Sequence, residues 1–332
     1  MKRTVRRQLE PGFNTVETVV FMEGLSSIEH YHTRGERPRR VLENINLVIK
    51  RPESWGIYGR SLLEIKLLLE VMANIKPYHA GRCILVERGM MRNKRVILEH
   101  VFYICGPTML YDNMNVLEFL MFATAKRGSG AVYRQEQIFE LLLSIGLGPI
   151  SLTPIARLTR EEKVVVTLLV TAYSESVMIV FNVPEYRFNR MLSTAIAHIA
   201  ALIKERGKTL IMGSKDCRLI EKSCSHTAYV AEGRMIYQGT VEELRLTYDK
   251  ILLIIEDPEA PQIMERLAPR LPELHFTLKG RRLLISEPGE DNTDPHLIYE
   301  NIIRSGFAPR SMKVNPKTVQ NAYEEIDRQY DL

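Results

Sequence analysis

The fold of this chain is decided by residues 232–244, EGRMIYQGTVEEL. Gly233 follows an apolar run at Ala228–Ala231, and the residues after it return as a second strand that leads into a short helix. Before this hairpin-like pair, apolar runs and helical spacing alternate at Val177–Phe181, Met191–Glu205 and Thr209–Met212. Short, continuous apolar runs are typical of strands buried on both faces. The alternation predicts an α/β domain with a largely parallel sheet.

Strands and helices alternate in the first half of the chain as well. We expect strands at Val16–Met22, Val41–Ile49, Ser54–Gly59, Cys83–Val86 and His100–Ile104. We expect helices at Leu62–Ile75, Val116–Lys126 and Gln135–Leu143, with Pro77 ending the first of them.

The pattern changes after Lys250. Predicted strands and helices follow in the order strand, helix, strand, strand, helix, strand, and a last helix spans Lys317–Ile326. This order predicts a small α+β domain of the ferredoxin-like kind. We therefore divide the chain into a basic tail at 1–15, an α/β domain at 16–247 and a small domain at 248–332.

Charge and composition exclude several classes of protein. The 332 residues carry a formal charge of +5, of which residues 1–7 supply +4 and residues 34–40 supply +3, so the rest is near neutral. Two short basic segments are a weak case for a nucleic-acid-binding protein. No run of about 20 apolar residues is present, since 164–183 is interrupted by polar residues. The four cysteines lack a CxxC pair, so we expect reduced thiols and a cytoplasmic protein.

Residues 16–246 resemble the ATP-binding domain of ABC transporters, a P-loop NTPase-like domain with a helical subdomain. The segments that carry the resemblance are VLENINLVIKRPESWGIYGR (41–60), IKPYHAGRCILVERG (75–89), VFYICGPTMLYDNMNVLEFLMFA (101–123) and, most specifically, residues 232–244. The small domain resembles that of the drug- and antibiotic-export branch, through PKTVQNAYEEI (316–326).

The phosphate-binding loop of that family needs the run G-x-x-x-x-G-K-[ST], in which glycine N–H groups, a lysine and a hydroxyl hold phosphate and magnesium. The corresponding run is Gly59–Lys66, GRSLLEIK. Gly59 is kept, but Glu64 stands for the second glycine, Ile65 for the lysine and Lys66 for the hydroxyl. Glu64 would place a carboxylate against phosphate oxygens. An insertion would let Lys66 act as the lysine; otherwise Lys66 is a surface residue of the helix.

The other motif positions are also changed. The spacing of 24 positions from Leu158 to Asn182 supports the alignment. In this alignment, Asn182 occupies the position of the magnesium-binding aspartate and Val183 that of the catalytic glutamate. Gly106 occupies the position of the Q-loop glutamine, and Lys215 occupies that of the switch histidine. A neutral amide is a poor magnesium ligand, and valine cannot polarise a water molecule. We therefore expect no magnesium site and at most weak ATP binding.

The signature motif of the family corresponds to Leu158–Glu162, where Thr159 keeps a hydroxyl and Glu161 and Glu162 introduce carboxylates. The dipole of a helix favours carboxylates at its N-terminus, but these repel phosphate. The β-branched run Val164–Thr167 follows, so either burial overrides its low helix propensity or the signature helix is altered. The candidates for remaining nucleotide contacts are Tyr31, which would stack on adenine, Gly59, Ser61, Lys66 and Thr159.

The leading hypothesis is an ATP-binding subunit that has lost catalysis and acts as a structural or regulatory half. The resemblance implies a homodimer or a heterodimer with an active ATPase subunit, held at the membrane by a permease. The candidates for permease contact are Met109, Leu110, Tyr111 and Met114, which core packing would explain equally well. One alternative is a functional exporter ATPase whose unusual site uses Lys66 and Glu185. Another is a module that binds nucleic acid or anionic lipid through its basic segments.

Overall fold

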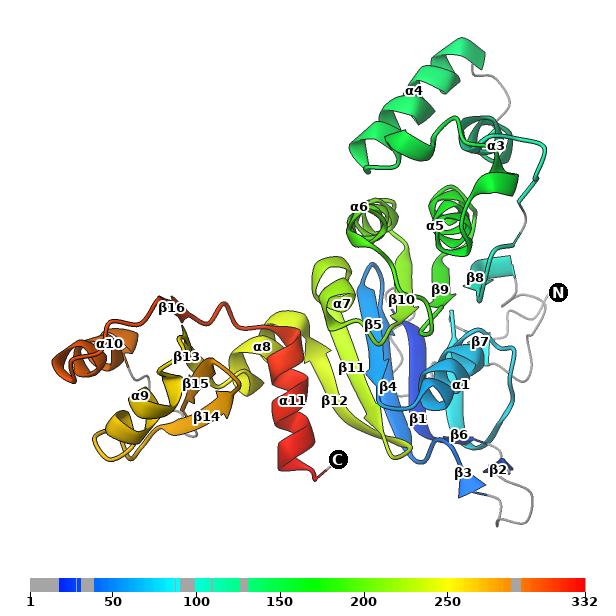
Figure 1. The fold of residues 1–332 in the computed structure, drawn as a ribbon. Coiled ribbons are helices and arrows are strands. Elements are labelled where there is room, and N and C mark those ends of the chain that lie inside the picture. The colour runs from blue at the N-terminus through cyan, green and yellow to red at the C-terminus, as the bar shows by residue number, and fades with distance from the viewer. Residues whose placement is uncertain are drawn as a thin grey trace. The chain divides into compact units, whose positions relative to one another are not determined.

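The computed structural model describes residues 18–27, 29–30, 39–86, 88–89, 99–108, 110–125, 131–287 and 294–331. The chain forms two compact units, Met1–Thr240 and Val241–Leu332 (Figure 1). The predicted tail at 1–15, Tyr31 and Met109 lie outside the described residues. None of the helices in the described part of the chain is both long and apolar enough to cross a bilayer.

A six-stranded sheet forms the centre of the first unit, in the order β12-β11-β5-β10-β9-β8. Its strands are β5 (Ser54–Gly59), β8 (Val101–Ile104), β9 (Met178–Asn182), β10 (Thr209–Gly213), β11 (His226–Ala231) and β12 (Arg234–Thr240). All neighbours are parallel except β12, which pairs antiparallel with β11. Strands β9 and β10 are buried throughout, which confirms the predicted α/β fold with a largely parallel sheet.

A four-stranded antiparallel sheet packs beside it, in the order β4-β1-β6-β7. Its strands are β1 (Thr18–Ser27), β4 (Ile45–Lys50), β6 (Tyr78–Leu85) and β7 (Arg88–Gly89), and a short pair joins β2 (Glu29–His30) to β3 (Arg39–Arg40). Buried and exposed residues alternate along β4, so one face is packed. That face, helix α1 (Leu62–Met72) and the central sheet share one hydrophobic core.

The helical part of the first unit contains α3 (Val116–Ala123), α4 (Ala131–Ser144) and α5 (Arg160–Thr171), with two short 3-10 turns at Gly148–Ile150 and Ile155–Arg157. Helices α6 (Arg190–Glu205) and α7 (Cys217–Ser223) follow. Figure 1 shows α5 and α6 between the α3–α4 pair and the six-stranded sheet. The β-branched run in α5 is helical, because Val164, Val165 and Val166 are fully buried and packing outweighs their local preference.

The second unit begins at α8 (Val241–Tyr248), earlier than the predicted boundary at 248. The reason is that α8 packs against α11 (Val319–Gln329), and the Arg245 guanidinium Nε donates to the carbonyl of Lys317 at 2.7 Å. Between them lie β13 (Ile251–Glu256), α9 (Ala260–Leu267), β14 (His275–Lys279), β15 (Arg282–Ser286), α10 (Pro295–Arg304) and β16 (Ser311–Val314). The sheet order β14-β15-β13-β16 is the ferredoxin-like arrangement that the element order predicts.

A buried carboxylate fixes the start of this unit. Asp249 is fully buried, and its side chain accepts hydrogen bonds from the backbone N–H groups of Ile251 (3.2 Å) and Thr318 (2.6 Å). The amides of Asn315 and Asn321 donate to it as well, at 2.8 and 3.0 Å. Four donors compensate the burial of one charge and connect the segment between α8 and β13 to the segment that enters α11.

Candidate functional site

The turn from β5 to α1 is where the sequence places the phosphate-binding loop. Strand β5 ends at Gly59 and α1 begins at Leu62 with Ser61 as its N-cap, so only Arg60 and Ser61 lie between them. Most of the run that aligns with the loop is therefore helix, and the N–H of Ile65 already donates to the carbonyl of Ser61 at 3.3 Å. A phosphate cradle needs several loop N–H groups that converge on one point, and a two-residue turn does not supply them.

Gly59 has a local explanation, and Ser61 occupies the N-cap position of α1. A Cβ atom on Gly59 would lie 2.6 Å from the carbonyl oxygen of Val230, so glycine is required where β5 and β11 approach each other. The Ser61 side chain makes no capping hydrogen bond to α1. Neither residue is therefore evidence of a phosphate site.

Glu64 does not face a phosphate position, contrary to the expectation from the sequence. It is buried, and its Oε1 accepts a hydrogen bond from the N–H of Gly233 at 2.9 Å, in the turn between β11 and β12. The early start of α1 places residue 64 in the first helical turn with its side chain toward that hairpin. Ile65, at the position of the phosphate-binding lysine, is fully buried in the core of the unit.

Lys66 and Glu185, which the alternative hypothesis pairs, do lie together. The Lys66 Nζ is 3.1 Å from Glu185 Oε1, and the two side chains are 40% and 30% exposed. Each therefore neutralises the other at the solvent boundary. An exposed pair of this kind contributes less than about 1 kcal/mol to stability.

Asn182, at the end of β9, connects three elements through its amide. It is 2% exposed, and its Nδ2 donates to the carbonyl of Lys66 in α1 at 3.2 Å and to the Tyr103 hydroxyl in β8 at 2.9 Å. Burial raises the pKa of Tyr103 to about 12, so this phenol stays protonated. These contacts use the two N–H bonds of an amide, which a carboxylate lacks.

A magnesium–nucleotide complex does not fit these residues. Asn182 offers one neutral oxygen, Oδ1, which has no hydrogen-bond partner, and Val183 beside it is buried. No group of three or more histidine, cysteine or acidic side chains is placed to hold a metal ion in the part of the chain that the structure describes. Magnesium requires several oxygen ligands, usually including a carboxylate.

The start of α5, where the signature motif aligns, satisfies its own hydrogen bonds. The Thr159 hydroxyl accepts from the Glu162 N–H at 3.2 Å, and the Glu162 carboxylate accepts from the Thr159 N–H at 2.8 Å. This capping box stabilises the helix and places a carboxylate where an external anion would approach. Arg160 instead lies over the ring of Tyr186, 4.6 Å from its centroid.

Two further motif positions lie at the ends of β8 and β10. Gly106 is beside Tyr186, since a Cβ atom at 106 would be 3.5 Å from the Tyr186 hydroxyl. Lys215, at the switch-histidine position, is exposed, and its Nζ donates to the carbonyl of Arg60 at 2.6 Å. Lys215 thus holds the β5–α1 turn. The contribution of Tyr186 was not predicted, and its position four residues after Asn182 is the only signal that could have suggested it.

The candidates for permease contact are partly exposed. Tyr111 is 49% exposed, and Leu110 and Met114 are half-buried. The Tyr111 ring meets that of Phe122, edge to face, with centroids 5.5 Å apart, and Phe122 is 57% exposed. The sequence predicts the helix that carries Phe122 but not its exposure, and Tyr111 and Phe122 together form what we call the Tyr111–Phe122 patch.

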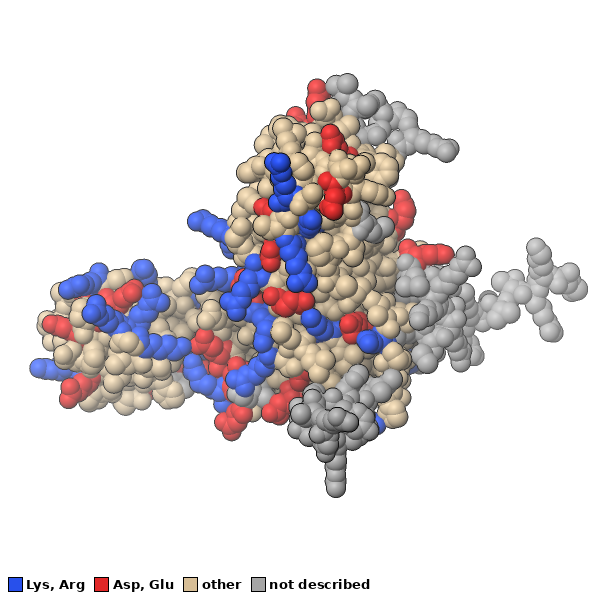
Figure 2. All heavy atoms as spheres, turned by 45° about the vertical axis from the view of Figure 1, so that its right-hand side comes forward, with Lys and Arg blue, Asp and Glu red and all other residues tan. Residues whose placement is uncertain are grey.

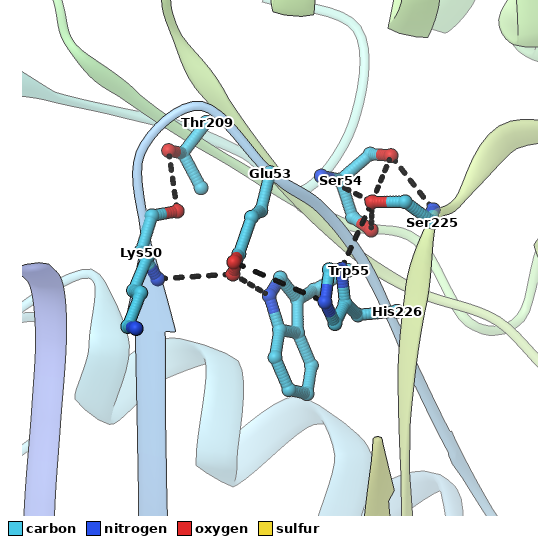
Figure 3. Close-up of polar contacts among 7 residues, drawn as sticks. All are labelled: Lys50, Glu53, Ser54, Trp55, Thr209, Ser225 and His226. Carbon is cyan, nitrogen blue, oxygen red and sulfur yellow. Dashed lines mark hydrogen bonds and ion pairs between the residues drawn. The ribbon is translucent and has the colours of Figure 1, made fainter. Parts of the chain in front are cut away.

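A separate polar cluster lies at the amino ends of β5 and β11, away from this site (Figure 3). The Glu53 carboxylate accepts from the Trp55 indole N–H at 2.7 Å and from the Lys50 backbone N–H at 3.0 Å. His226 stacks on Trp55 with ring centroids 5.0 Å apart, and its Nε2 is 3.9 Å from Glu53. We interpret the cluster as a structural link between the two strand starts.

The basic segments of the sequence gain no support. They lie outside the described residues, apart from Arg39 and Arg40 in β3. Lys and Arg side chains are interspersed with Asp and Glu on the face drawn in Figure 2, rather than gathered into one basic stripe.

No family model matches the chain. The uncharacterized ABC transporter ATP-binding protein YbbA of Escherichia coli strain K12 is 26% identical over 208 residues, which cover 61% of this chain and 91% of YbbA. The methionine import ATP-binding protein MetN of Latilactobacillus sakei is 20% identical over 262 residues, covering 75% of this chain and 76% of MetN. Among solved structures, cbiO1 of Clostridium perfringens, described as part of the ABC transporter complex cbiONQ, is 18% identical with a TM-score of 0.52. The matched region covers 77% of this chain and 96% of the cbiO1 chain.

Proposed function

We propose that this chain, a homologue of ABC transporter ATP-binding subunits with their α/β fold, does not hydrolyse ATP and acts as a structural or regulatory subunit of a transporter. The observation that carries the proposal is the two-residue turn between Gly59 and Leu62. Phosphoryl transfer depends on positioned donors and cations around the phosphate and on an oriented water molecule. The turn provides no cradle, and Asn182 and Val183 provide no carboxylate for a metal ion or for water.

The proposal is tested by assaying ATP hydrolysis with magnesium, first for the isolated chain and then with an active ATPase subunit encoded beside it. We expect no turnover by the isolated chain and a change in the rate or assembly of the active subunit when both are present. Magnesium-dependent turnover by the isolated chain, above that of a mock preparation, would refute the proposal.

We propose that a permease binds the chain and holds it at the membrane. Support comes from cbiO1, which is described as part of a transporter complex, and from the exposed Tyr111–Phe122 patch. Exposed apolar rings favour a protein interface. Co-purification with a neighbouring permease should be weakened by Tyr111→Ser or Phe122→Ser. The control Val48→Ser, at a 42% exposed position of β4, should leave co-purification unchanged. Equal recovery of all variants would contradict the assignment.

The resemblance of residues 316–326 to the drug- and antibiotic-export branch supports an export system as the setting. An active ATPase subunit is the second partner that we propose, because a chain without hydrolysis needs another source of energy for transport. Size measurement of the chain alone and with that subunit separates a homodimer from a heterodimer.

A functional ATPase with an unusual site is the second candidate, because Lys66 and Glu185 lie 3.1 Å apart. It predicts calorimetric binding of Mg-ATP that is lost in Lys66→Ala. We expect instead that Lys66→Ala has no effect on Mg-ATP titrations, since the ammonium is already paired and the nearby Asn182 and Val183 offer no carboxylate for a metal ion. A large loss of binding in Lys66→Ala would favour the second candidate.

A further inference from the structure

A polar cavity of about 470 Å³ lies between strand β12 and the segment that enters β4, and it shares no lining residue with the β5–α1 turn. Figure 1 shows β4 and β12 side by side. All of the lining residues belong to the first unit. Sites for small molecules typically measure about 300–1,000 Å³, so the cavity is large enough for a small ligand.

Hydrogen bonds hold the wall that enters β4 in place. The N–H of Glu43 donates to the carbonyl of Gly233 at 2.7 Å, in the turn between β11 and β12. The Asn46 side chain accepts from the N–H of Gly24 at 2.9 Å and donates to the carbonyl of Asn44 at 3.1 Å. This backbone is therefore fixed before a ligand binds, and such preorganisation lowers the cost of binding.

The other wall is an edge strand with a bulge. In the pairing of β12 with β11, Tyr237 lies opposite Tyr229 and Met235 lies opposite Val230, so Ile236 is the extra residue. Bulges redirect side chains and are common at sheet edges and beside functional sites. Met235, Ile236 and Tyr237 line the cavity and are half-buried, so they give it an apolar part.

The two charged residues of the lining stand on different walls. Glu43 precedes β4 and Arg234 begins β12, and both are exposed. Within the described part of the chain, neither side chain makes an ion pair or a hydrogen bond, and the two are not paired with each other. Their charges cancel in sum, so the cavity favours a ligand that carries one charge of each sign over a simple anion or cation.

We propose that this cavity binds a small zwitterion of the free amino-acid kind, with its carboxylate on Arg234 and its ammonium group on Glu43. A guanidinium group binds a carboxylate through two parallel N–H···O bonds, and a carboxylate accepts charge-assisted hydrogen bonds from an ammonium group. The apolar part of the wall suits an apolar side chain on the ligand. The inference goes beyond the proposed function and does not depend on it, because it involves neither the loss of hydrolysis nor a partner protein.

The test is calorimetric titration of the full chain with leucine, N-acetylleucine and leucinamide, at low salt and about pH 6. Leucine carries both charges at this pH, whereas N-acetylleucine carries only the carboxylate and leucinamide only the ammonium group. We expect leucine to bind and each analogue to bind about 10- to 100-fold more weakly, because each analogue lacks one charge-assisted contact. Glycine keeps both charges but has no side chain, so it should bind more weakly than leucine.

Two substitutions assign the charges to the residues. Arg234→Gln and Glu43→Gln should each weaken leucine binding about 10- to 100-fold. Arg234→Gln should also bind leucine no more tightly than leucinamide, and Glu43→Gln should bind leucine no more tightly than N-acetylleucine. The controls Arg218→Gln on α7 and Glu205→Gln on α6 remove the same charges at exposed positions outside the lining and should change binding less than about twofold.

Three outcomes would overturn the inference: no leucine binding at about 10 mM, equal affinity of the wild-type chain for leucine and both analogues, or equal weakening by the control substitutions. All four substitutions are at exposed positions, so we expect unchanged melting by circular dichroism. Failure of this inference is distinguishable from failure of the proposed function, because the latter is judged by magnesium-dependent ATP turnover and no leucine titration changes that result.

Discussion

Replacing Asn182 by aspartate introduces the residue that a magnesium site would need, yet we expect it to destabilise the fold and to bind no metal. The amide donates to the Lys66 carbonyl and to the Tyr103 hydroxyl. An ionised aspartate cannot donate, so the Lys66 carbonyl would be deprived of its side-chain donor and face a buried negative charge. The Tyr103 hydroxyl can reverse and donate, which preserves one hydrogen bond.

The expected cost follows from these two hydrogen bonds. A buried polar group left without its partner costs about 1–3 kcal/mol, and more when a charge is involved. Because the bond to Lys66 is broken and the bond to Tyr103 is reversed, we expect Asn182→Asp to lower the free energy of unfolding by about 2–4 kcal/mol at pH 7. Burial would raise the pKa of the new carboxyl above its unfolded value of about 3.9. The folded state then holds that proton more tightly, so the deficit is smallest below about pH 4 and grows as pH rises.

Urea unfolding followed by fluorescence measures this directly. Trp55 is the only tryptophan of the chain and is buried in the first unit, so its emission reports on the unit that contains Asn182. Asn182→Leu is the matched control, because it removes the donors without adding a charge, and its deficit should not vary between pH 4 and pH 8. Wild-type stability of Asn182→Asp at pH 7, or a magnesium-dependent rise in its melting temperature, would show the reasoning to be wrong.

Four further predictions concern other polar and titratable side chains. Asp249→Asn should lower the free energy of unfolding of the second unit by about 2–3 kcal/mol, because an amide replaces a carboxylate that accepts from four donors. Circular dichroism should detect this loss of stability, whereas the tryptophan emission from the first unit should be unchanged. Lys208→Met should fray the last turn of α5 and speed amide hydrogen exchange there, because the buried ammonium donates to carbonyls at the end of that helix. Unchanged exchange would contradict the role of Lys208 as a cap of α5. Thiol reagents should modify Cys105 rapidly and spare Cys83 and Cys224 until unfolding, since only Cys105 is exposed. Burial raises the pKa of both protected thiols, that of Cys83 to about 12. Stability should therefore fall as pH rises above the unfolded value of about 8.5, by up to about 1.4 kcal/mol per pH unit for each thiol.

Much of the fold was predictable because its signals are local. The continuous apolar runs of β9 and β10 are buried on both faces, as their composition predicts. Local propensity was misleading at Val164–Val166, where packing holds β-branched residues in a helix. Two expectations for Gly59–Lys66 were incompatible, since helical spacing begins at Leu62 and the motif alignment requires a loop. The structure agrees with the helical spacing.

The site was less predictable because its contacts join distant parts of the chain. The partner of Glu64 is the N–H of Gly233, 169 positions away, and no pattern in the first helix indicates that hydrogen bond. Glu43 and Arg234 line one cavity only because β12 lies beside the segment that enters β4. The sequence shows which motif residues are missing, whereas the chemistry that replaces them depends on the topology of the sheet.

The short β5–α1 turn also limits how the chain could be engineered. Substituting side chains would change the composition of residues 59–66 but not the length of the turn, which is fixed by where β5 ends and α1 begins. A phosphate cradle would require extra residues between Gly59 and Leu62. Such an insertion would have to keep α1 in place, because Glu64 and Ile65 anchor its first turn to the hairpin and to the core. Introducing a phosphate cradle is thus a problem of inserting backbone, with the register of the helix as the constraint.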